Sequence, residues 1–137
     1  MDAASLLSDE RARLLQAARD VARRAYAPYS HFKVGAAVLT EQGGLYQGCN
    51  VENASYGLTI CAERAAIFSA VAQEGGETAK IQAIAVLTEH GSPASPCGAC
   101  RQVIFEFGPH ALVLFQGRDY LEECRASELL PKGFVLE

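Results

Sequence analysis

The sequence IQAIAVL at residues 81–87 decides the fold, because six of its seven side chains are apolar. A short run that is apolar on both sides of the chain is typical of a strand buried on both faces of a sheet. Residues 111–115, ALVLF, form a second run of this kind. Each buried strand needs a covering layer on either face, so the sequence predicts an α/β fold with helices on both sides of one sheet.

The other elements follow from the spacing of apolar residues and from turn residues. Helical spacing predicts helices over about 8–25, 59–73, 95–107 and 127–131. Alternating apolar residues and a Gly-Gly turn predict strands over about 32–38, 45–51 and 120–125. Ser8 and Ser95 are expected to cap the first and third helices. The order of elements predicts a three-layer α/β/α sandwich with one mixed five-stranded sheet, in which residues 1–137 form a single domain.

The composition is that of a small soluble protein. Half of the 137 residues are hydrophobic, the net charge is -4, and the sequence pI is near 5.4 without any basic cluster. A nucleic-acid backbone is therefore disfavoured as a partner, whereas a small neutral substrate fits. The chain has no apolar run of about 18 residues, and its first residues lack the order of a secretory signal. We expect a cytoplasmic protein without a membrane partner.

Three of the five cysteines stand where helices are predicted to begin. Cys61 opens the second helix, and Cys97 and Cys100 lie in the first turn of the third. Helices that follow neighbouring parallel strands begin at the same edge of a sheet, so we expect the three sulfurs to converge. Helix N-termini favour thiolates, and three thiolates would hold a zinc ion with an open fourth position, as in catalytic sites. The alternative is a structural site completed by Cys49, Cys124 or a histidine.

Two charged residues close to Cys61 have predicted roles at this site. Glu63 is not needed as a ligand but could reach a metal-bound water, so it is expected to shuttle protons. Three thiolates leave Zn²⁺ with a net charge of about -1, which weakens the metal as a Lewis acid. Arg64 is expected to offset this charge by donating to a ligand sulfur, and Arg101 is a second candidate.

The segments CAER (61–64) and PCGACRQ (96–102) together resemble the zinc cytidine deaminases, specifically the short homotetrameric kind with three cysteine ligands. The motifs YSHFKVGAA (29–37), GCNVENAS (48–55) and LLPKGF (129–134) extend the resemblance over most of the chain. Other branches of this family place histidine where this chain has Cys61, which favours the tetrameric branch.

The resemblance implies hydrolytic deamination of cytidine and 2′-deoxycytidine to uridine and 2′-deoxyuridine with release of ammonia, a reaction of pyrimidine salvage. It implies one zinc ion per chain, held by Cys61, Cys97 and Cys100. It further implies that zinc hydroxide attacks C4 of the cytosine ring, while Glu63 protonates N3 and then the departing amine.

The resemblance also implies which residues bind the nucleoside. Asn50 and Glu52 match residues that hold the sugar hydroxyls, and Phe32 matches an aromatic that packs against the nucleoside. Ala62 falls within the same substrate site. In the homotetramer the active sites are shared between subunits, and the residues expected to act across an interface are Ala54, Tyr56 and Phe134.

Two other functions compete with this interpretation. One is a deaminase for another aminopyrimidine nucleoside, such as an antibiotic of the blasticidin type, which would differ in its use of Asn50 and Glu52. The other is a zinc-stabilised binding module without catalysis, which would need a fourth protein ligand and would not need Glu63.

Overall fold

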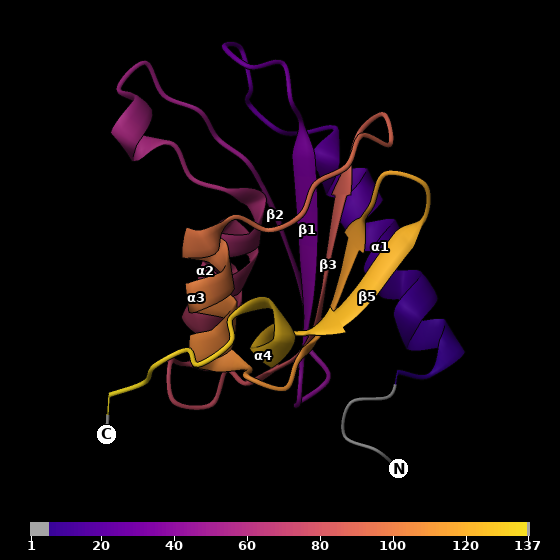
Figure 1. Cartoon of the computed structure of the whole chain (residues 1–137), viewed down its shortest axis with the longest axis vertical. Helices are drawn as coiled ribbons and strands as arrows, with labels where there is room; N and C mark the ends of the chain where they lie inside the picture. The colour runs from indigo at the N-terminus through magenta and orange to yellow at the C-terminus, as the bar shows by residue number, and fades with distance from the viewer. Residues whose placement is uncertain (1–5, 137) are drawn as a thin grey trace.

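The computed structural model describes residues 6–136, which are built around one five-stranded sheet (Figure 1). The strands are β1 (Val34–Thr40), β2 (Leu45–Cys49), β3 (Ile81–Thr88), β4 (Leu112–Gln116) and β5 (Leu121–Arg125). Their order in the sheet is β2-β1-β3-β4-β5. Only the β3–β4 pair is parallel among these strands, so the sheet is mixed, as predicted.

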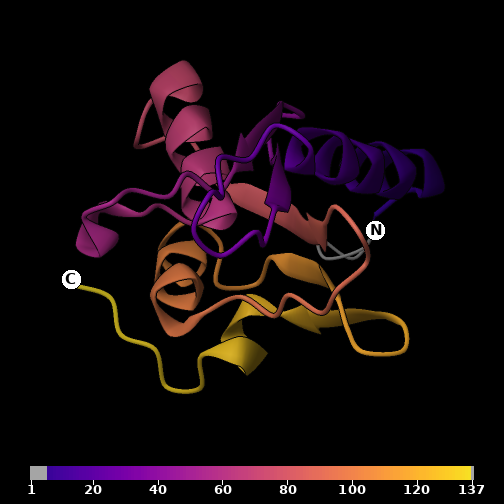
Figure 2. The same cartoon turned by 90° about the horizontal axis from the view of Figure 1, so that it is seen from above.

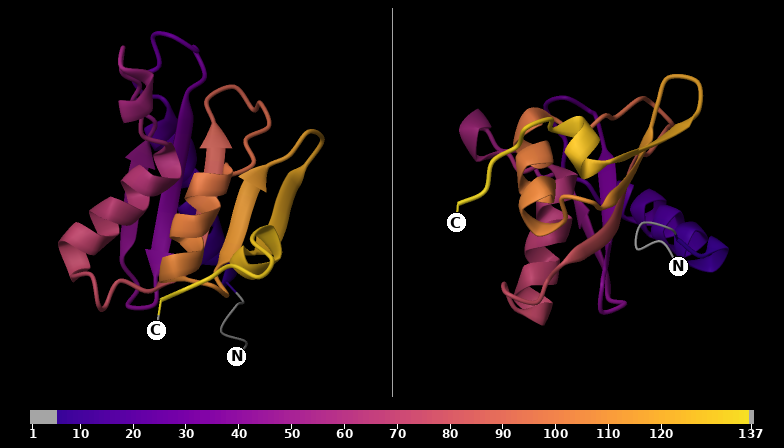
Figure 3. Two further views of the ribbon diagram at one scale, coloured as in Figure 1. Left: turned by 60° about the vertical axis from the view of Figure 1, so that its left-hand side comes forward. Right: turned by 60° about the horizontal axis from the view of Figure 1, so that its bottom comes forward.

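Helices cover both faces of the sheet. They are α1 (Ser8–Ala22), α2 (Ala62–Glu74), α3 (Gly98–Phe107) and α4 (Ala126–Leu129), with a short 3₁₀ helix at Tyr56–Leu58. Figures 2 and 3 show α1 on one side of the sheet and the other three α-helices on the opposite side. The predicted three-layer α/β/α sandwich is confirmed. No helix among residues 6–136 is long and apolar enough to cross a membrane.

The sheet separates two hydrophobic cores. The core under α1 contains Leu14, Ala18, Ala37, Leu39 and Ala85. The core under α2 and α3 contains Ala66, Ile67, Ile104, Val38 and Ile84. Successive residues of β1 and β3 point alternately into one core and the other, which is why both strands are apolar along almost their whole length.

The start of β1 differs from the prediction. The strand begins at Val34, and Phe32, predicted to lie within it, precedes it and is 41% exposed. The reason is local, because the Asn50 side chain bonds the carbonyl of Phe32 and the amide of Val34 in place of a strand neighbour. Every residue of β1 is buried, so the single apolar face predicted here is in fact two.

The helix starts also differ from the prediction. Helix α1 has Leu7 as its N-cap, so Ser8 is its first helical residue, and it ends at Ala22 rather than near residue 25. The predicted second helix begins later, at Ala62, because residues 56–58 form a 3₁₀ turn and Ile60 pairs with Val51. Ser95 caps no helix; the N-caps of α2 and α3 are Cys61 and Cys97.

The two cysteine-bearing helices begin at the same edge of the sheet, but not for the predicted reason. Strands β2 and β3, which precede α2 and α3, are separated by β1 and are not neighbours. Each is antiparallel to β1, so they run in the same direction and deliver both helices to one edge. Gly48 lets α2 lie close to β2, since a Cβ there would sit 2.2 Å from the amide nitrogen of Ala66.

Candidate active site

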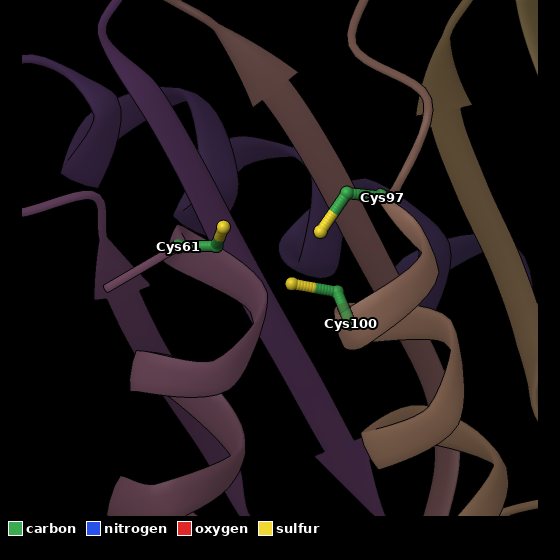
Figure 4. Close-up of side chains that lie close together, drawn as sticks. All are labelled: Cys61, Cys97 and Cys100. Carbon is green, nitrogen blue, oxygen red and sulfur yellow. The ribbon is translucent and has the colours of Figure 1, made fainter. Parts of the chain in front are cut away.

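Three cysteine sulfurs meet between α2 and α3 (Figure 4). Cys61 and Cys97 are the N-cap residues, both with extended backbone, and Cys100 is buried in the first turn of α3. The Sγ atoms all lie within 4.8 Å of one another. Neither N-cap side chain makes a capping hydrogen bond to its helix, so the places where Ser, Thr or Asp usually cap a helix are occupied by thiols that face each other.

This donor set fits zinc. Three thiols at helix N-termini are soft ligands in a setting that favours thiolate, which suits a tetrahedral zinc ion. Within the described part of the chain, no fourth cysteine, histidine, aspartate or glutamate joins the group. Cys49 and Cys124 are free cysteines outside it. The residues therefore offer three ligands and leave a fourth position open, which is the arrangement of a catalytic site.

Arg64 lies one turn along α2 and makes the predicted hydrogen bond to a sulfur. Its Nη2 donates to Cys61 Sγ over 3.3 Å. A hydrogen bond from Cys100, aided by Arg64, lowers the pKa of the Cys61 thiol to about 5 against the opposing effect of burial. The same hydrogen bond and burial raise the pKa of Cys100. One thiolate is thus stabilised by the protein itself. Arg101, the second candidate, donates to other groups instead.

Glu63 is a buried carboxyl beside the sulfurs. Its side chain lies on the first turn of α2 and is only 5% exposed. Burial raises the pKa of Glu63 to about 7, and the negative charge on Cys61 adds to the rise. A carboxyl that titrates near neutral pH is suited both to accept a proton and to return it.

Two adjoining hollows open beside this cluster. The inner hollow has a volume of about 190 Å³, and the predicted site residues on its wall are Cys61, Ala62, Glu63, Cys97, Phe32 and Asn50. The outer hollow, of about 380 Å³, contains Glu52 and Tyr56 and shares Thr59 with the inner one. A larger hollow of about 610 Å³ lies at the amino ends of β3 and β4 and contains none of the predicted site residues.

Asn50 is held on both sides by backbone groups, one in the loop before β1 and one at the first residue of β1. Its Oδ1 accepts from the amide of Val34 over 2.8 Å, and its Nδ2 donates to the carbonyl of Phe32 over 2.7 Å. The side chain therefore fixes where Phe32 lies on the wall of the inner hollow, a role that the sequence did not reveal.

Glu52 is engaged in a similar way. One carboxylate oxygen accepts the amides of Tyr29 and Ser30 over 3.0 and 3.1 Å, and the other accepts the Ser30 hydroxyl. The hydrogen bond from the Ser30 side chain is the main cause that lowers the pKa of Glu52, so this carboxyl stays ionised. The Ser30 hydroxyl also accepts the amide of Phe32 over 3.0 Å. No role was predicted for Ser30 from the sequence. Its place within the motif at 29–37 was the one sequence feature that could have drawn attention to it.

The residues expected to act across an interface lie apart from the inner hollow. Tyr56 is 76% exposed on the 3₁₀ turn and borders the outer hollow. Ala54 is exposed just before that turn, and Phe134 is 66% exposed on the C-terminal segment. Neither Ala54 nor Phe134 lines either hollow of its own chain. The structure thus brings together the expected residues of one chain and leaves these two facing outward.

A three-layer α/β/α fold with three converging cysteines and a buried carboxyl beside them defines a zinc-dependent hydrolytic enzyme. Residues 8–116 match the family model described as the cytidine and deoxycytidylate deaminase zinc-binding region, so the chain belongs to this family.

Known proteins agree in sequence and structure. A cytidine deaminase from Sporosarcina psychrophila is 45% identical over 127 residues, covering 91% of each chain. The crystal structure of cytidine deaminase from Burkholderia pseudomallei has a TM-score of 0.80 and 49% identity, covering 90% of this chain and 98% of its own. A blasticidin-S deaminase from Bacillus cereus is less similar, at 29% identity over 136 residues, 94% of this chain and 95% of its own.

Proposed function

We propose that this protein catalyses the zinc-dependent hydrolytic deamination of cytidine and 2′-deoxycytidine to uridine and 2′-deoxyuridine, with release of ammonia. The observation that carries the proposal is the cluster of three sulfurs within 4.8 Å beside the buried carboxyl of Glu63. The similarity to proteins named cytidine deaminase supports the choice of substrate.

Cys61, Cys97 and Cys100 would hold one zinc ion per chain. When bound, zinc supplies a Lewis acid that makes a water nucleophilic at neutral pH. Arg64 supports the ligand set by donating to Cys61, which withdraws negative charge from the sulfur.

Glu63 carries the proton transfers. Its carboxylate would accept a proton from the attacking water, and the resulting carboxylic acid would return that proton to N3 of the cytosine ring. Once the C4–O bond has formed, Glu63 takes the remaining proton of the hydroxyl on C4 and passes it to the exocyclic amine; the C4–N bond then breaks, ammonia leaves, and C4 becomes the carbonyl carbon of uridine. The buried position of Glu63 keeps these protons from bulk water.

The two hollows suit the two parts of a nucleoside. The inner one, walled by Phe32 and Ala62 beside the sulfurs, fits the pyrimidine ring, and the outer one with Glu52 fits the sugar. One oxygen of Glu52 already accepts two amides, while the other accepts only the Ser30 hydroxyl and retains an acceptor position. That position and the remaining capacity of Asn50 would bind neutral sugar hydroxyls.

A homotetramer with shared active sites accounts for the outward-facing residues. Three large apolar residues are mostly exposed: Tyr56 is 76% exposed, Leu58 71% and Phe134 66%. We infer that Ala54, Tyr56 and Phe134 contribute to sites on neighbouring subunits. Light scattering is expected to give four times the 14.6 kDa chain mass, and a monomer at assay concentration would contradict this assembly.

We place the enzyme in pyrimidine salvage in the cytoplasm, with residues 1–137 acting as one catalytic domain. The acidic net charge of -4 supports a small neutral substrate over nucleic acid.

The test of the function is the loss of cytidine absorbance on incubation with purified protein, before and after treatment with a zinc chelator. Turnover that stops with the chelator and returns with added zinc is expected. Absence of turnover by zinc-loaded protein would leave the non-catalytic binding module as the better account. Faster turnover of blasticidin S than of cytidine would favour the antibiotic deaminase instead.

A further inference from the structure

Arg101 makes three side-chain hydrogen bonds, two to the residues just before Cys97 and one to the carbonyl of Leu129 at the end of α4. We propose that Arg101 is a positioning residue: its guanidinium holds the loop that carries Cys97 against the helix that carries Cys100, and anchors the C-terminal segment on the same group. The inference rests on the zinc site proposed above.

The first two hydrogen bonds fix the loop before Cys97. Arg101 Nε donates to the carbonyl of Pro96 over 2.7 Å, and its Nη2 donates to the Ser95 hydroxyl over 2.8 Å. Arg101 directly follows Cys100 in the first turn of α3. One rigid guanidinium therefore ties the helix that holds one sulfur to the residues that immediately precede another.

The loop needs such a tie because Pro96 has no amide to donate. Its carbonyl and the Ser95 side chain are groups through which the protein can hold this stretch in place. Ser95 also lines the inner hollow together with Cys97. A shift of the loop would therefore change both the sulfur position and the shape of the hollow.

The third hydrogen bond reaches the other end of the chain. Arg101 Nη1 donates to the carbonyl of Leu129, the last residue of α4, over 3.2 Å. The adjacent residue, Gln102, donates through Nε2 to the carbonyl of Phe134 over 3.4 Å. Two consecutive residues of α3, Arg101 and Gln102, thus hold the C-terminal segment that carries Phe134. Arg101 therefore contacts both this segment and the residues before Cys97.

Arginine suits this role better than lysine because its planar group points donors in three fixed directions at once. Arg101→Lys keeps the positive charge but replaces the planar guanidinium with a single ammonium group, which cannot donate in the same three directions. Arg118, on the exposed turn between β4 and β5, is the matched control for an Arg→Lys change. Ser95→Ala removes one of the three contacts and leaves Arg101 in place.

The experiment measures zinc release from the loaded protein to a colorimetric chelator, together with hydrogen exchange of the amides between residues 129 and 134. Arg101→Lys is expected to release zinc about 10-fold faster than the unmodified protein, the lower end of the effect of groups that bond a metal ligand directly, because Arg101 acts through the residues before Cys97. Its C-terminal amides are expected to exchange faster. Ser95→Ala should speed zinc release to a smaller extent without changing exchange, and Arg118→Lys should change neither.

Zinc release at the unmodified rate in Arg101→Lys, or an equal effect of Arg118→Lys, would overturn the proposal. If Arg101→Lys does not fold, unchanged zinc release in Ser95→Ala overturns it instead. Failure of the unmodified protein to bind zinc would refute the proposed function. Unchanged exchange of the C-terminal amides in Arg101→Lys would refute this inference alone.

Discussion

Asn50→Asp tests the structural role of Asn50, which is to hold the loop that carries Phe32. The amide accepts from Val34 over 2.8 Å and donates to the Phe32 carbonyl over 2.7 Å. An ionised aspartate keeps the first bond but sets a charged oxygen against that carbonyl. The bond that is lost, from Nδ2 to the Phe32 carbonyl, is exposed, so its loss costs about 0.5–1.5 kcal/mol. In a chain of this length that lowers Tm by about 2–6 °C.

The deficit should depend on pH with a defined sign. A protonated aspartic acid can donate to the Phe32 carbonyl again, so folding favours the neutral form and raises the pKa of the introduced group above its usual value of about 3.9. The stability that this proton supplies is fully present below the unfolded pKa and is lost as pH rises through the raised folded pKa. Asn50→Asp should therefore lie closest to the unmodified protein near pH 4 and furthest from it above about pH 6.

The assay is thermal unfolding followed by circular dichroism between about pH 4 and 8. Asn50→Ala is the control, because it removes both hydrogen bonds and carries no titratable group, so its deficit should be nearly constant with pH. A deficit for Asn50→Asp that does not vary with pH, or is absent, would refute the argument that this side chain holds the Phe32 loop.

Three further changes test other parts of the account. Ser30→Ala removes the hydroxyl that orders Glu52 and should raise KM for cytidine about 2- to 10-fold with little change in kcat, whereas Ser30→Thr should keep KM. The hydrogen bond from Ser30 lowers the pKa of Glu52, so it stabilises the fold above the ordinary pKa of a glutamate and this stabilisation is lost as pH falls through the lowered pKa. Acid unfolding of Ser30→Ala should therefore lack this loss, and equal acid sensitivity of Ser30→Ala and the unmodified protein would contradict the assignment. Arg64→Ala should lower zinc affinity or turnover by about 10- to 100-fold, because the hydrogen bond to Cys61 is lost. If both zinc affinity and turnover were unchanged, Arg64 would not support the ligand sulfur. Gly48→Ala places a Cβ 2.2 Å from a backbone nitrogen of α2 and should lower Tm strongly, whereas Gly76→Ala, with its nearest atom at 3.8 Å, should not.

The fold was predictable because its strongest signals are local. The runs at 81–87 and 111–115 are apolar throughout since both faces of β3 and β4 are covered, and this pattern alone requires three layers. The element edges were less predictable. Ser8 and Ser95 have the chemistry of N-caps, yet the residues at the N-cap positions of α1 and α3 are Leu7 and Cys97.

The site was predictable in its ligands and less so in its supports. Cysteine spacing indicates which sulfurs could converge, and the structure brings these three within 4.8 Å. The roles of Ser30 and Arg101 depend on contacts between segments far apart in sequence, such as the bond from Arg101 to Leu129. Neither the periodicity nor the spacing of residues in the sequence indicates such pairs, so these contacts could be identified only from the structure.

The most direct test of the central claim is to measure zinc content and cytidine turnover in one sample of Glu63→Gln. The amide is close in size to the carboxyl but cannot exchange the proton, so the account predicts about one zinc ion per chain and a loss of turnover of about 100-fold or more. Turnover near that of the unmodified protein would contradict the proton-transfer role of Glu63. Loss of zinc together with turnover would show instead that Glu63 is needed to hold the metal.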